Sequence, residues 1–233
     1  MHPSISWQNS IGIVENHLSE FIDITGVKYQ INRQVHEDLQ ALLSAAKQAG
    51  IEIAVVSAYR SFSRQLQIWN NKWIGKSQLL DRNAQPLEFS QLDDEQKFKA
   101  ICHWSAIPGL SRHHWGTDFD IFNAQAINKG YQVRLIPEEF GSLGPCTHLA
   151  NWLDNNLENF QFFRPYRIYQ QGVAAEPWHI SHIQCSHQFR QYFNKKQYLN
   201  FIDTIKLEGK AIIQQQLDHY LCQYFDNICL PQP

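Results

Sequence analysis

Residues 111–120, with the sequence SRHHWGTDFD, combine side chains that could bind a metal ion. A zinc site needs neutral imidazole nitrogens and carboxylate oxygens on a rigid frame. A loop that turns at Gly116 and runs into a strand can bring His113 and Asp120 inward together. Local roles are equally open, since His113 could form a nearby hydrogen bond and Asp120 could cap a neighbouring element.

The adjacent His114 and Asp118 fit the ligand role less well. Neighbouring side chains generally point in different directions, so His114 is a poorer candidate than His113. The alternation over residues 116–122 predicts a strand on which Asp118 and Asp120 share one face. We therefore interpret Asp118 as a carboxylate that orients a metal-binding imidazole.

A second stretch, EPWH at residues 176–179, could complete a catalytic metal site. A catalytic zinc ion with three protein ligands keeps one position for water, and a nearby carboxylate can take the proton of that water. Glu176 suits the carboxylate role and His179 the ligand role. The alternative is that Glu176 is a surface charge and that a backbone carbonyl satisfies the ring of His179.

Arg60 closes one predicted strand and opens a predicted helix. A charge at the end of a buried strand is costly unless it faces a cleft or a partner. Arg60 could stabilise a developing oxyanion in a cleft, or it could form an ordinary ion pair with a carboxylate. Its position alone leaves both roles open.

Hydrophobic periodicity predicts the elements that must hold these side chains. The predicted helices cover 34–49, 61–75, 93–104 and 147–160, and the predicted strands cover 51–60, 116–122, 163–170 and 178–184. Polar residues 76–96 predict a surface excursion, and the chain from about residue 186 has helical spacing. Mixed helices and short strands indicate an α+β fold, with a small, mostly antiparallel sheet flanked by helices.

Composition narrows the class of protein. The chain has 233 residues, of which 43% are hydrophobic and 13% aromatic, enough for one well-packed domain. A formal net charge of -2 means that the chain has no excess of positive charge that would attract nucleic acid. The 5 cysteines lack the paired spacing of a zinc ribbon or a disulfide framework, so we expect them to be reduced and mostly buried.

The N-terminal residues predict no secretory signal peptide. They lack a basic segment followed by a continuous apolar stretch, and nowhere does an apolar run reach the length of a membrane span. A complete chain would therefore be cytoplasmic. A chain trimmed of a leader would instead be periplasmic or exported.

Three stretches taken together resemble a known family: SAYRS (57–61), SRHHWGTDFD (111–120) and EPWH (176–179). The zinc D-alanyl-D-alanine carboxypeptidases of the vancomycin-resistance type carry S-G-Y-R-S, S-x-H-x-x-G-x-A-x-D and E-x-W-H in that order. The same family includes D,D-dipeptidases and phage L-alanyl-D-glutamate endopeptidases. Residues 152–166 are also similar, and the resemblance spans about residues 35–183.

The resemblance implies a role for each chemical group. His113, Asp120 and His179 match the three ligands of one Zn²⁺ ion. Glu176 matches the general base, and Arg60 matches the arginine that steadies the substrate carbonyl and the transition state.

Some matches are looser. Ser111 and Gln65 stand where the family often has polar groups near the substrate. Asp118 replaces a residue that is commonly small, and we hypothesise that it raises zinc affinity or tunes the bound water through His113. Gln161 replaces a frequent glycine.

The implied function is zinc-dependent hydrolysis of a short peptidoglycan-type peptide, such as a stem peptide or a muropeptide. A D-alanyl-D-alanine carboxypeptidase is favoured over an L-alanyl-D-glutamate endopeptidase because no cell-wall-binding module is attached. A non-catalytic, zinc-stabilised module of the same fold that binds a peptide or a protein is the alternative. The presence of both Glu176 and Arg60 argues against that alternative, because a structural zinc site needs neither.

The remaining C-terminal residues lie outside the resemblance. We predict a peptidase domain over 1–185 and a helical extension over 186–233 that packs on the same domain. This extension is rich in tyrosine, phenylalanine and leucine, which suits a cover over the core or a dimer contact.

Overall fold

A central antiparallel sheet carries the segments singled out above. In the computed structural model, which describes residues 5–231, its hydrogen-bonded order is β3-β4-β6-β5. The bounds are β3 (Ile53–Ser57), β4 (Asp118–Asn123), β5 (Phe162–Phe163) and β6 (His179–His182). Apolar residues on β3 and β4 are buried, as the β-branched and aromatic pattern predicts. The small, antiparallel sheet expected from the sequence is confirmed.

The predicted helices are present, with short additional turns. Their bounds are α2 (His36–Gln48), α3 (Phe62–Trp73), α4 (Asp94–Trp104), α6 (Thr147–Asn156), α7 (Ile183–Tyr192), α8 (Lys195–Asp203) and α9 (Lys210–Tyr220). Shorter pieces are α1 (Trp7–Ser10), α5 (Ala124–Asn128), the 3₁₀ turns η1 (Arg33–Val35), η2 (Phe89–Gln91), η3 (Arg112–Trp115), η4 (Pro137–Phe140) and η5 (Leu157–Phe160), and the π turn η6 (Leu221–Phe225). Ser61 caps α3 by accepting a hydrogen bond from the Arg64 N–H, which satisfies one of the free N–H groups of the first turn.

A further hairpin joins this frame from the N-terminal side. It consists of β1 (Leu18–Ile22) and β2 (Lys28–Asn32), which pair antiparallel. No element was predicted for this part of the chain.

The strand predicted over 163–170 is wrong for most of its length. Only Phe163 belongs to β5, and the residues that follow form turns. Pro165 has no N–H to donate to a neighbouring strand, so pairing ends just before it. The strand predicted over 178–184 also ends early, because the His182 ring accepts the Cys185 N–H and caps helix α7.

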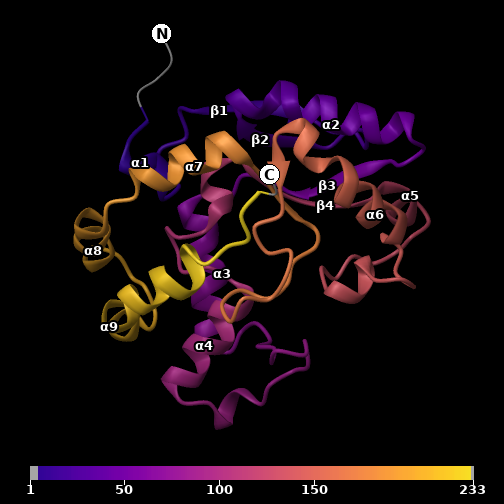
Figure 1. Cartoon of the computed structure of the whole chain (residues 1–233). Coiled ribbons are helices and arrows are strands. Elements are labelled where there is room, and N and C mark those ends of the chain that lie inside the picture. The colour runs from indigo at the N-terminus through magenta and orange to yellow at the C-terminus, as the bar shows by residue number, and fades with distance from the viewer. Residues whose placement is uncertain (1–4, 232–233) are drawn as a thin grey trace.

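Two apolar clusters divide the interior. One packs the sheet against α2 and α6 through residues such as Leu39, Ile121 and Leu153. The other joins α3 and α4 to the C-terminal helices through residues such as Trp69 and Leu217. Figure 1 shows α2 along one side of β3 and β4, with α3, α4 and α9 gathered on the other side.

The C-terminal segment is helical and contributes to the second cluster, as a cover over the core would. Helix α7 spans the predicted boundary at residue 185, and the division of the chain at that point stays a prediction. All 5 cysteines are free, and only Cys222 is exposed, in agreement with the expectation. Among residues 5–231, no helix has the length and apolar character needed to cross a membrane.

Candidate metal centre and active site

A cavity of about 330 Å³ opens where the two apolar clusters meet. Trp178 of the first cluster and Leu110 of the second both line it. Most of the polar residues proposed from the sequence line this cavity. They are Arg60, Ser111, His113, Asp120, Glu176 and His179. Such a mixture of apolar walls and a few convergent polar groups is typical of a ligand site.

Strand register places two of the candidate ligands opposite each other. Asp120 on β4 pairs with His179 on β6, and Asp118 pairs with Ser181 two positions along. Because side chains alternate across a sheet, Asp118 and Asp120 share the face that His179 also occupies. An irregularity in the β3–β4 pairing lies beside this point, between Val55 and Ser57.

His113 reaches the same face from the turn η3. Gly116 ends this turn with φ of 66°, in the left-handed region that glycine adopts without strain. A Cβ atom there would lie 2.7 Å from the Asn32 backbone nitrogen, so the position also lacks room for a side chain. The turn redirects the chain from His113 into β4, as the sequence predicted.

Three ligand atoms converge. The nearest nitrogen or carboxylate oxygen atoms of His113, Asp120 and His179 all lie within 4.8 Å of one another, and all three residues are buried. His113 Nε2 is 3.3 Å from Asp120 Oδ2, and His179 Nδ1 is 3.2 Å from Asp120 Oδ1. These residues form a group that could hold a metal ion.

The other nitrogen of each ring is already engaged. His113 Nδ1 lies 2.9 Å from the carbonyl oxygen of Ala58, and His179 Nε2 lies 3.0 Å from Asp118 Oδ1. When the ring is neutral, each of these contacts requires the ring proton to be on the nitrogen that faces away from Asp120. The free lone pairs of His113 Nε2 and His179 Nδ1 then point to the same place.

The residues therefore fit a zinc ion by two criteria. Two imidazoles and one carboxylate are a known ligand set for catalytic zinc. Asp120 Oδ1 is also buried and accepts no hydrogen bond, because the lone pair of the neutral His179 Nδ1 faces it, and few side-chain atoms among residues 5–231 are in this situation. A buried, unpaired carboxylate oxygen is costly unless a cation neutralises it.

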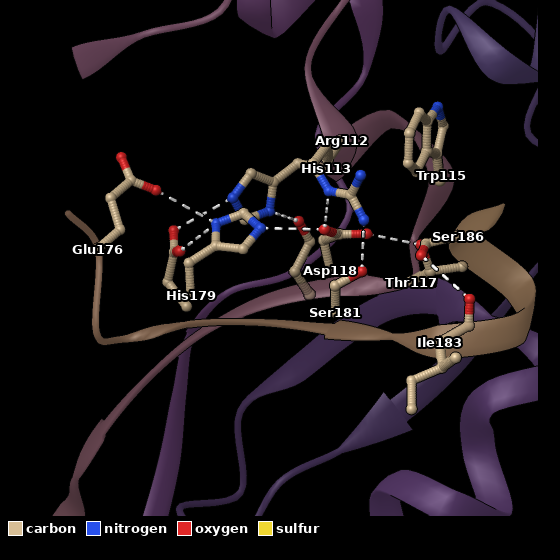
Figure 2. A network of polar contacts seen from close by, with 12 residues as sticks. Arg112, His113, Trp115, Thr117, Asp118, Glu176, His179, Ser181, Ile183 and Ser186 are labelled. Carbon is tan, nitrogen blue, oxygen red and sulfur yellow. Dashed lines mark hydrogen bonds and ion pairs between the residues drawn. The ribbon is translucent and has the colours of Figure 1, made fainter. Parts of the chain in front are cut away.

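Asp118 is tied into a buried network rather than exposed to the cavity (Figure 2). It accepts hydrogen bonds from Arg112 Nε at 2.7 Å and from the Thr117 hydroxyl at 2.7 Å. It contacts His179 and not His113, so the expectation that it acts through His113 is wrong. The register explains this, since Asp118 lies beside β6 while the Nδ1 atom of His113 faces Ala58.

Arg112 is a site residue that the sequence analysis missed. Its NH2 group donates to Ser181 Oγ at 2.7 Å, and its guanidinium lies 4.7 Å from the Trp115 ring centroid. Burial alone would raise the pKa of Asp118, but Arg112 and His179 overcome this and hold it well below its usual range. The SRHH motif contains Arg112, yet nothing in its spacing shows that it pairs with Asp118.

The same carboxylates act on His179. Burial opposes its charged form, but the hydrogen bond that it donates to Asp118 and the nearby carboxylate of Asp120 outweigh burial and raise its pKa to about 9 in the metal-free chain. The pKa of Asp120 is held below its usual range despite burial, because His113 and His179 lie beside it. An ionised Asp120 suits a metal ligand.

Glu176 stands next to the metal-binding group. Its Oε2 atom is 3.5 Å from His179 Nδ1, and its side chain is 13% exposed. Burial raises the pKa of Glu176 to about 7, although His179 counteracts part of that effect. A carboxyl group that titrates near neutral pH can both accept and return a proton.

Arg60 is held in place from behind. Its NH1 group donates to Gln65 Oε1 at 2.9 Å, and its NH2 group lies 3.3 Å from Ser57 Oγ. The Gln65 amide in turn donates to the Ala106 carbonyl at 2.7 Å. Gln65 is fully buried and does not line the cavity, so the structure places it behind Arg60 rather than on the substrate side.

His114 points away from the metal-binding group. Its Nε2 atom accepts the Gly109 N–H, and its Nδ1 atom lies 2.6 Å from the Arg60 carbonyl oxygen. It therefore links η3 to the segment that carries Arg60. The preference for His113 over His114 agrees with this geometry.

Several cavity residues carried no recognisable signal in the sequence. Tyr166 lines the cavity with its ring 5.1 Å from the His179 ring. Tyr220 and Tyr224, which stack on each other, reach the cavity from the C-terminal segment. The helical spacing of these tyrosines predicted only that they pack against the core. Their place beside the site depends on how α9 packs against the rest of the chain.

Comparisons with known proteins show the family of the chain. The family model described as VanY, D-alanyl-D-alanine carboxypeptidase, matches residues 28–185. An uncharacterized protein of Haemophilus influenzae is 35% identical over 99 residues, which are 42% of this chain and 72% of that protein. A D-alanyl-D-alanine carboxypeptidase of Enterococcus faecalis is 29% identical over 157 residues, which are 66% of this chain and 48% of that protein. The chain thus matches about half the length of the Enterococcus relative.

Solved structures share the fold. VanYB in complex with D-alanine-D-alanine has a TM-score of 0.50 and 24% identity, covering 81% of this chain and 90% of its own. A VanY D,D-pentapeptidase mutant in complex with Zn(II) has the same score and identity, covering 76% and 90%. The LD-carboxypeptidase LdcB has a TM-score of 0.52 and 21% identity, covering 89% and 78%. Because the family model spans well over half of the sequence, this chain belongs to the VanY family of D-alanyl-D-alanine carboxypeptidases.

Proposed function

We propose that this chain is a zinc-dependent peptidase that hydrolyses short peptidoglycan-type peptides, as a D-alanyl-D-alanine carboxypeptidase. The observation that carries the proposal is the convergence of His113, Asp120 and His179 in one cavity beside Glu176. The family and the Enterococcus relative support the reaction. The D-alanine-D-alanine in the VanYB structure supports the ligand class, and Zn(II) in its relative supports the metal.

In this proposal His113 Nε2, His179 Nδ1 and Asp120 hold the zinc ion. When bound, zinc would lower the pKa of a water molecule to about 7 and polarise a peptide carbonyl. Glu176 accepts a proton from the attacking water, whose oxygen bonds to the carbonyl carbon. Glu176 then returns the proton to the amine nitrogen as the C–N bond breaks.

Arg60 acts on the other side of the reacting carbonyl. Its guanidinium donates hydrogen bonds to the oxygen on which negative charge develops. Gln65 positions Arg60 and touches no substrate, because it lies behind the guanidinium. Ser111 lines the cavity and is a candidate for a polar contact with the substrate.

The alternatives are a non-catalytic zinc module and an L-alanyl-D-glutamate endopeptidase. A zinc ion kept for structure uses four protein ligands and needs no buried carboxyl beside it. The group here has three protein ligands, with Glu176 and Arg60 on the same cavity, which favours catalysis.

Metal analysis of the purified protein, combined with mass spectrometry of a muropeptide mixture before and after incubation, tests the proposal. We expect one zinc ion per chain and release of one C-terminal residue. Glu176→Ala should keep zinc and lose hydrolysis by orders of magnitude, whereas His179→Ala should lose zinc. Normal turnover by Glu176→Ala would rule out the assignment.

The same assay separates the specificities found among related folds. A D,D-carboxypeptidase shortens a pentapeptide stem that ends in D-alanyl-D-alanine and leaves a tetrapeptide stem intact. An LD-carboxypeptidase, the activity named for LdcB, shortens the tetrapeptide instead. Cleavage of an internal bond would identify an endopeptidase.

A further inference from the structure

Another cavity, of about 450 Å³, lies next to the active-site cavity. Leu80 and Tyr224 line both cavities, so the two share this part of their walls. Basic side chains from three distant parts of the sequence meet in this second space, which we call the basic cavity. They are Arg82, Lys99, His103 and His219. None of the four has a role in the proposed hydrolysis.

Arg82 carries the main positive charge of the basic cavity. Its guanidinium lies 5.9 Å from the centroid of the Tyr169 ring, which is a cation–π distance. Within the described residues 5–231, Arg82 forms no ion pair and no hydrogen bond. The N–H donors of its guanidinium are therefore available to an anion, which they bind best in charge-assisted pairs.

Lys99 adds a second positive charge. It is four residues before His103 on α4, so both side chains lie on the same side of the helix. Lys99 Nζ is 2.6 Å from Glu95 Oε1, in an ion pair whose side chains are 63% and 60% exposed. Exposed pairs of this kind contribute little to stability, so the ammonium group can turn to an anion in the cavity at little cost.

One acidic residue, Asp81, also lines the basic cavity. Its Oδ1 atom accepts the backbone N–H groups of Asn83 and Gln85, each at 2.8 Å, and so shapes the turn that carries Arg82. The two cations Arg82 and Lys99 outweigh this single carboxylate. The lining therefore has an excess of positive charge, which favours an anion as the ligand.

His103 indicates which anion fits. Its Nδ1 atom lies 3.2 Å from the carbonyl oxygen of Gly172, an acceptor that only a protonated nitrogen satisfies. Burial lowers the pKa of His103, and Arg82 acts in the same direction, so the ring is neutral at neutral pH. The Nε2 atom then keeps a lone pair, and it has no partner within residues 5–231. It can accept a proton from a hydroxyl group of the ligand.

We propose that the basic cavity is a binding site for the hydrogenphosphate dianion, separate from the site of peptide hydrolysis. Arg82 and Lys99 donate hydrogen bonds to the charged oxygens, and His103 Nε2 accepts the proton of the P–OH group. Sulfate has the same shape and charge but carries no proton at neutral pH. The site therefore favours phosphate over sulfate.

Calorimetric titration of the purified protein with phosphate and with sulfate, slightly above neutral pH, tests the site. We expect one phosphate per chain, bound about tenfold more tightly than sulfate. Arg82→Gln should weaken the binding of both anions at least about tenfold, because it removes the main charge. Arg64→Gln removes an exposed arginine outside the basic cavity and should change neither affinity.

Two further variants separate anion recognition from an effect on folding. Asp81→Asn keeps an oxygen for the turn and removes the negative charge, so it should bind both anions about threefold more tightly. His103→Phe should remove the preference for phosphate and leave the affinity for sulfate unchanged. Equal affinities of the wild type for phosphate and sulfate, or no binding of either, would overturn the hydrogenphosphate site.

The same titration after removal of zinc locates the bound anion, because phosphate also binds zinc ions. We expect the affinity for phosphate to be the same with and without the metal. Phosphate binding that disappears with zinc, or that Arg82→Gln leaves intact, would place the anion outside the basic cavity and overturn the proposal. Neither result depends on whether the protein hydrolyses a peptide.

Discussion

Two arginine–aspartate pairs show how differently the sheet region and the C-terminal helices use the same chemistry. Arg112 and Asp118, beside the metal-binding group, have side chains 4% and 0% exposed. Arg190 and Asp226 pair through two contacts, of 2.5 and 2.8 Å, but their side chains are 34% and 45% exposed. The buried pair costs desolvation that the exposed pair avoids.

The buried pair has a function that accounts for this cost. It holds an ionised carboxylate against His179 Nε2 and so directs the Nδ1 atom toward Asp120. The C-terminal helices contribute no titratable ligand to the site, but they supply the aromatic wall formed by Tyr220 and Tyr224. The reactive groups therefore come from the part of the chain before the C-terminal helices, while those helices supply part of the cavity wall.

The largest expected effect comes from breaking the buried pair. Arg112→Met leaves Asp118 buried without its main counter-charge, so we expect a loss of about 3–5 kcal/mol in the free energy of unfolding. Arg190→Met in the exposed pair should cost about 1 kcal/mol or less. Urea unfolding of the metal-free variants measures both. Equal losses would contradict the contrast between the two regions.

A double variant checks the cause. Arg112→Met combined with Asp118→Asn removes both charges, so it should be more stable than Arg112→Met alone. A double variant that is less stable than Arg112→Met would show that lost packing, rather than the unpaired carboxylate, explains the loss.

The sheet region should also make the stability of the metal-free chain depend on pH. The pKa of Glu176 is raised from 4.5 to about 7, and that of His179 from 6.5 to about 9. The folded chain therefore binds protons more tightly than the unfolded chain, so stability falls as pH rises through these values. The pKa of Lys72, which burial lowers to about 8, offsets part of this loss above pH 8, so between pH 6 and 9 we expect a net loss of about 1–3 kcal/mol.

Zinc should reverse this trend, because zinc ligands must be deprotonated. Urea unfolding at several pH values, with zinc and with a chelator, measures the difference. The variant Glu176→Gln with His179→Asn should flatten the dependence of the metal-free chain. A metal-free wild type that is equally stable at pH 6 and pH 9 would contradict the raised pKa values.

The C-terminal wall should affect selectivity and not chemistry. Tyr224→Ala enlarges the cavity, so kcat/KM for peptides with a bulky side chain should rise about tenfold relative to peptides with alanine. Zinc content should stay unchanged, and Tyr224→Phe should behave like the wild type. Loss of zinc in Tyr224→Ala would show that the wall also supports the metal-binding group.

The smallest expected effect concerns a backbone position before β5. Gln161 has φ of 63°, where glycine is less strained than other residues. Gln161→Gly should raise the free energy of unfolding by up to about 1 kcal/mol, and Gln161→Ala, which keeps a Cβ atom, should not. Thermal unfolding measures this, and destabilisation by Gln161→Gly would show that the backbone is not strained there.

The short motifs carried the groups of the candidate site, because ligand chemistry requires particular residue types close to a turn or a strand end. His113, Asp120, His179, Glu176 and Arg60 all reach the cavity as the sequence indicated. Partners far apart in sequence were harder to foresee. The bond between Asp118 and His179 depends on the β4–β6 register, and the place of Gln65 behind Arg60 depends on how α3 packs.

By itself, the sequence determined the α+β class, the antiparallel sheet and the side chains able to bind a metal, since these follow from local periodicity and residue chemistry. Only the tertiary structure decided which nitrogen of each ring faces Asp120, that Arg112 pairs with Asp118, and that Tyr224 lines the cavity. These features depend on contacts between segments that are distant along the chain. Such contacts are set by packing and strand register, which short sequence patterns do not encode.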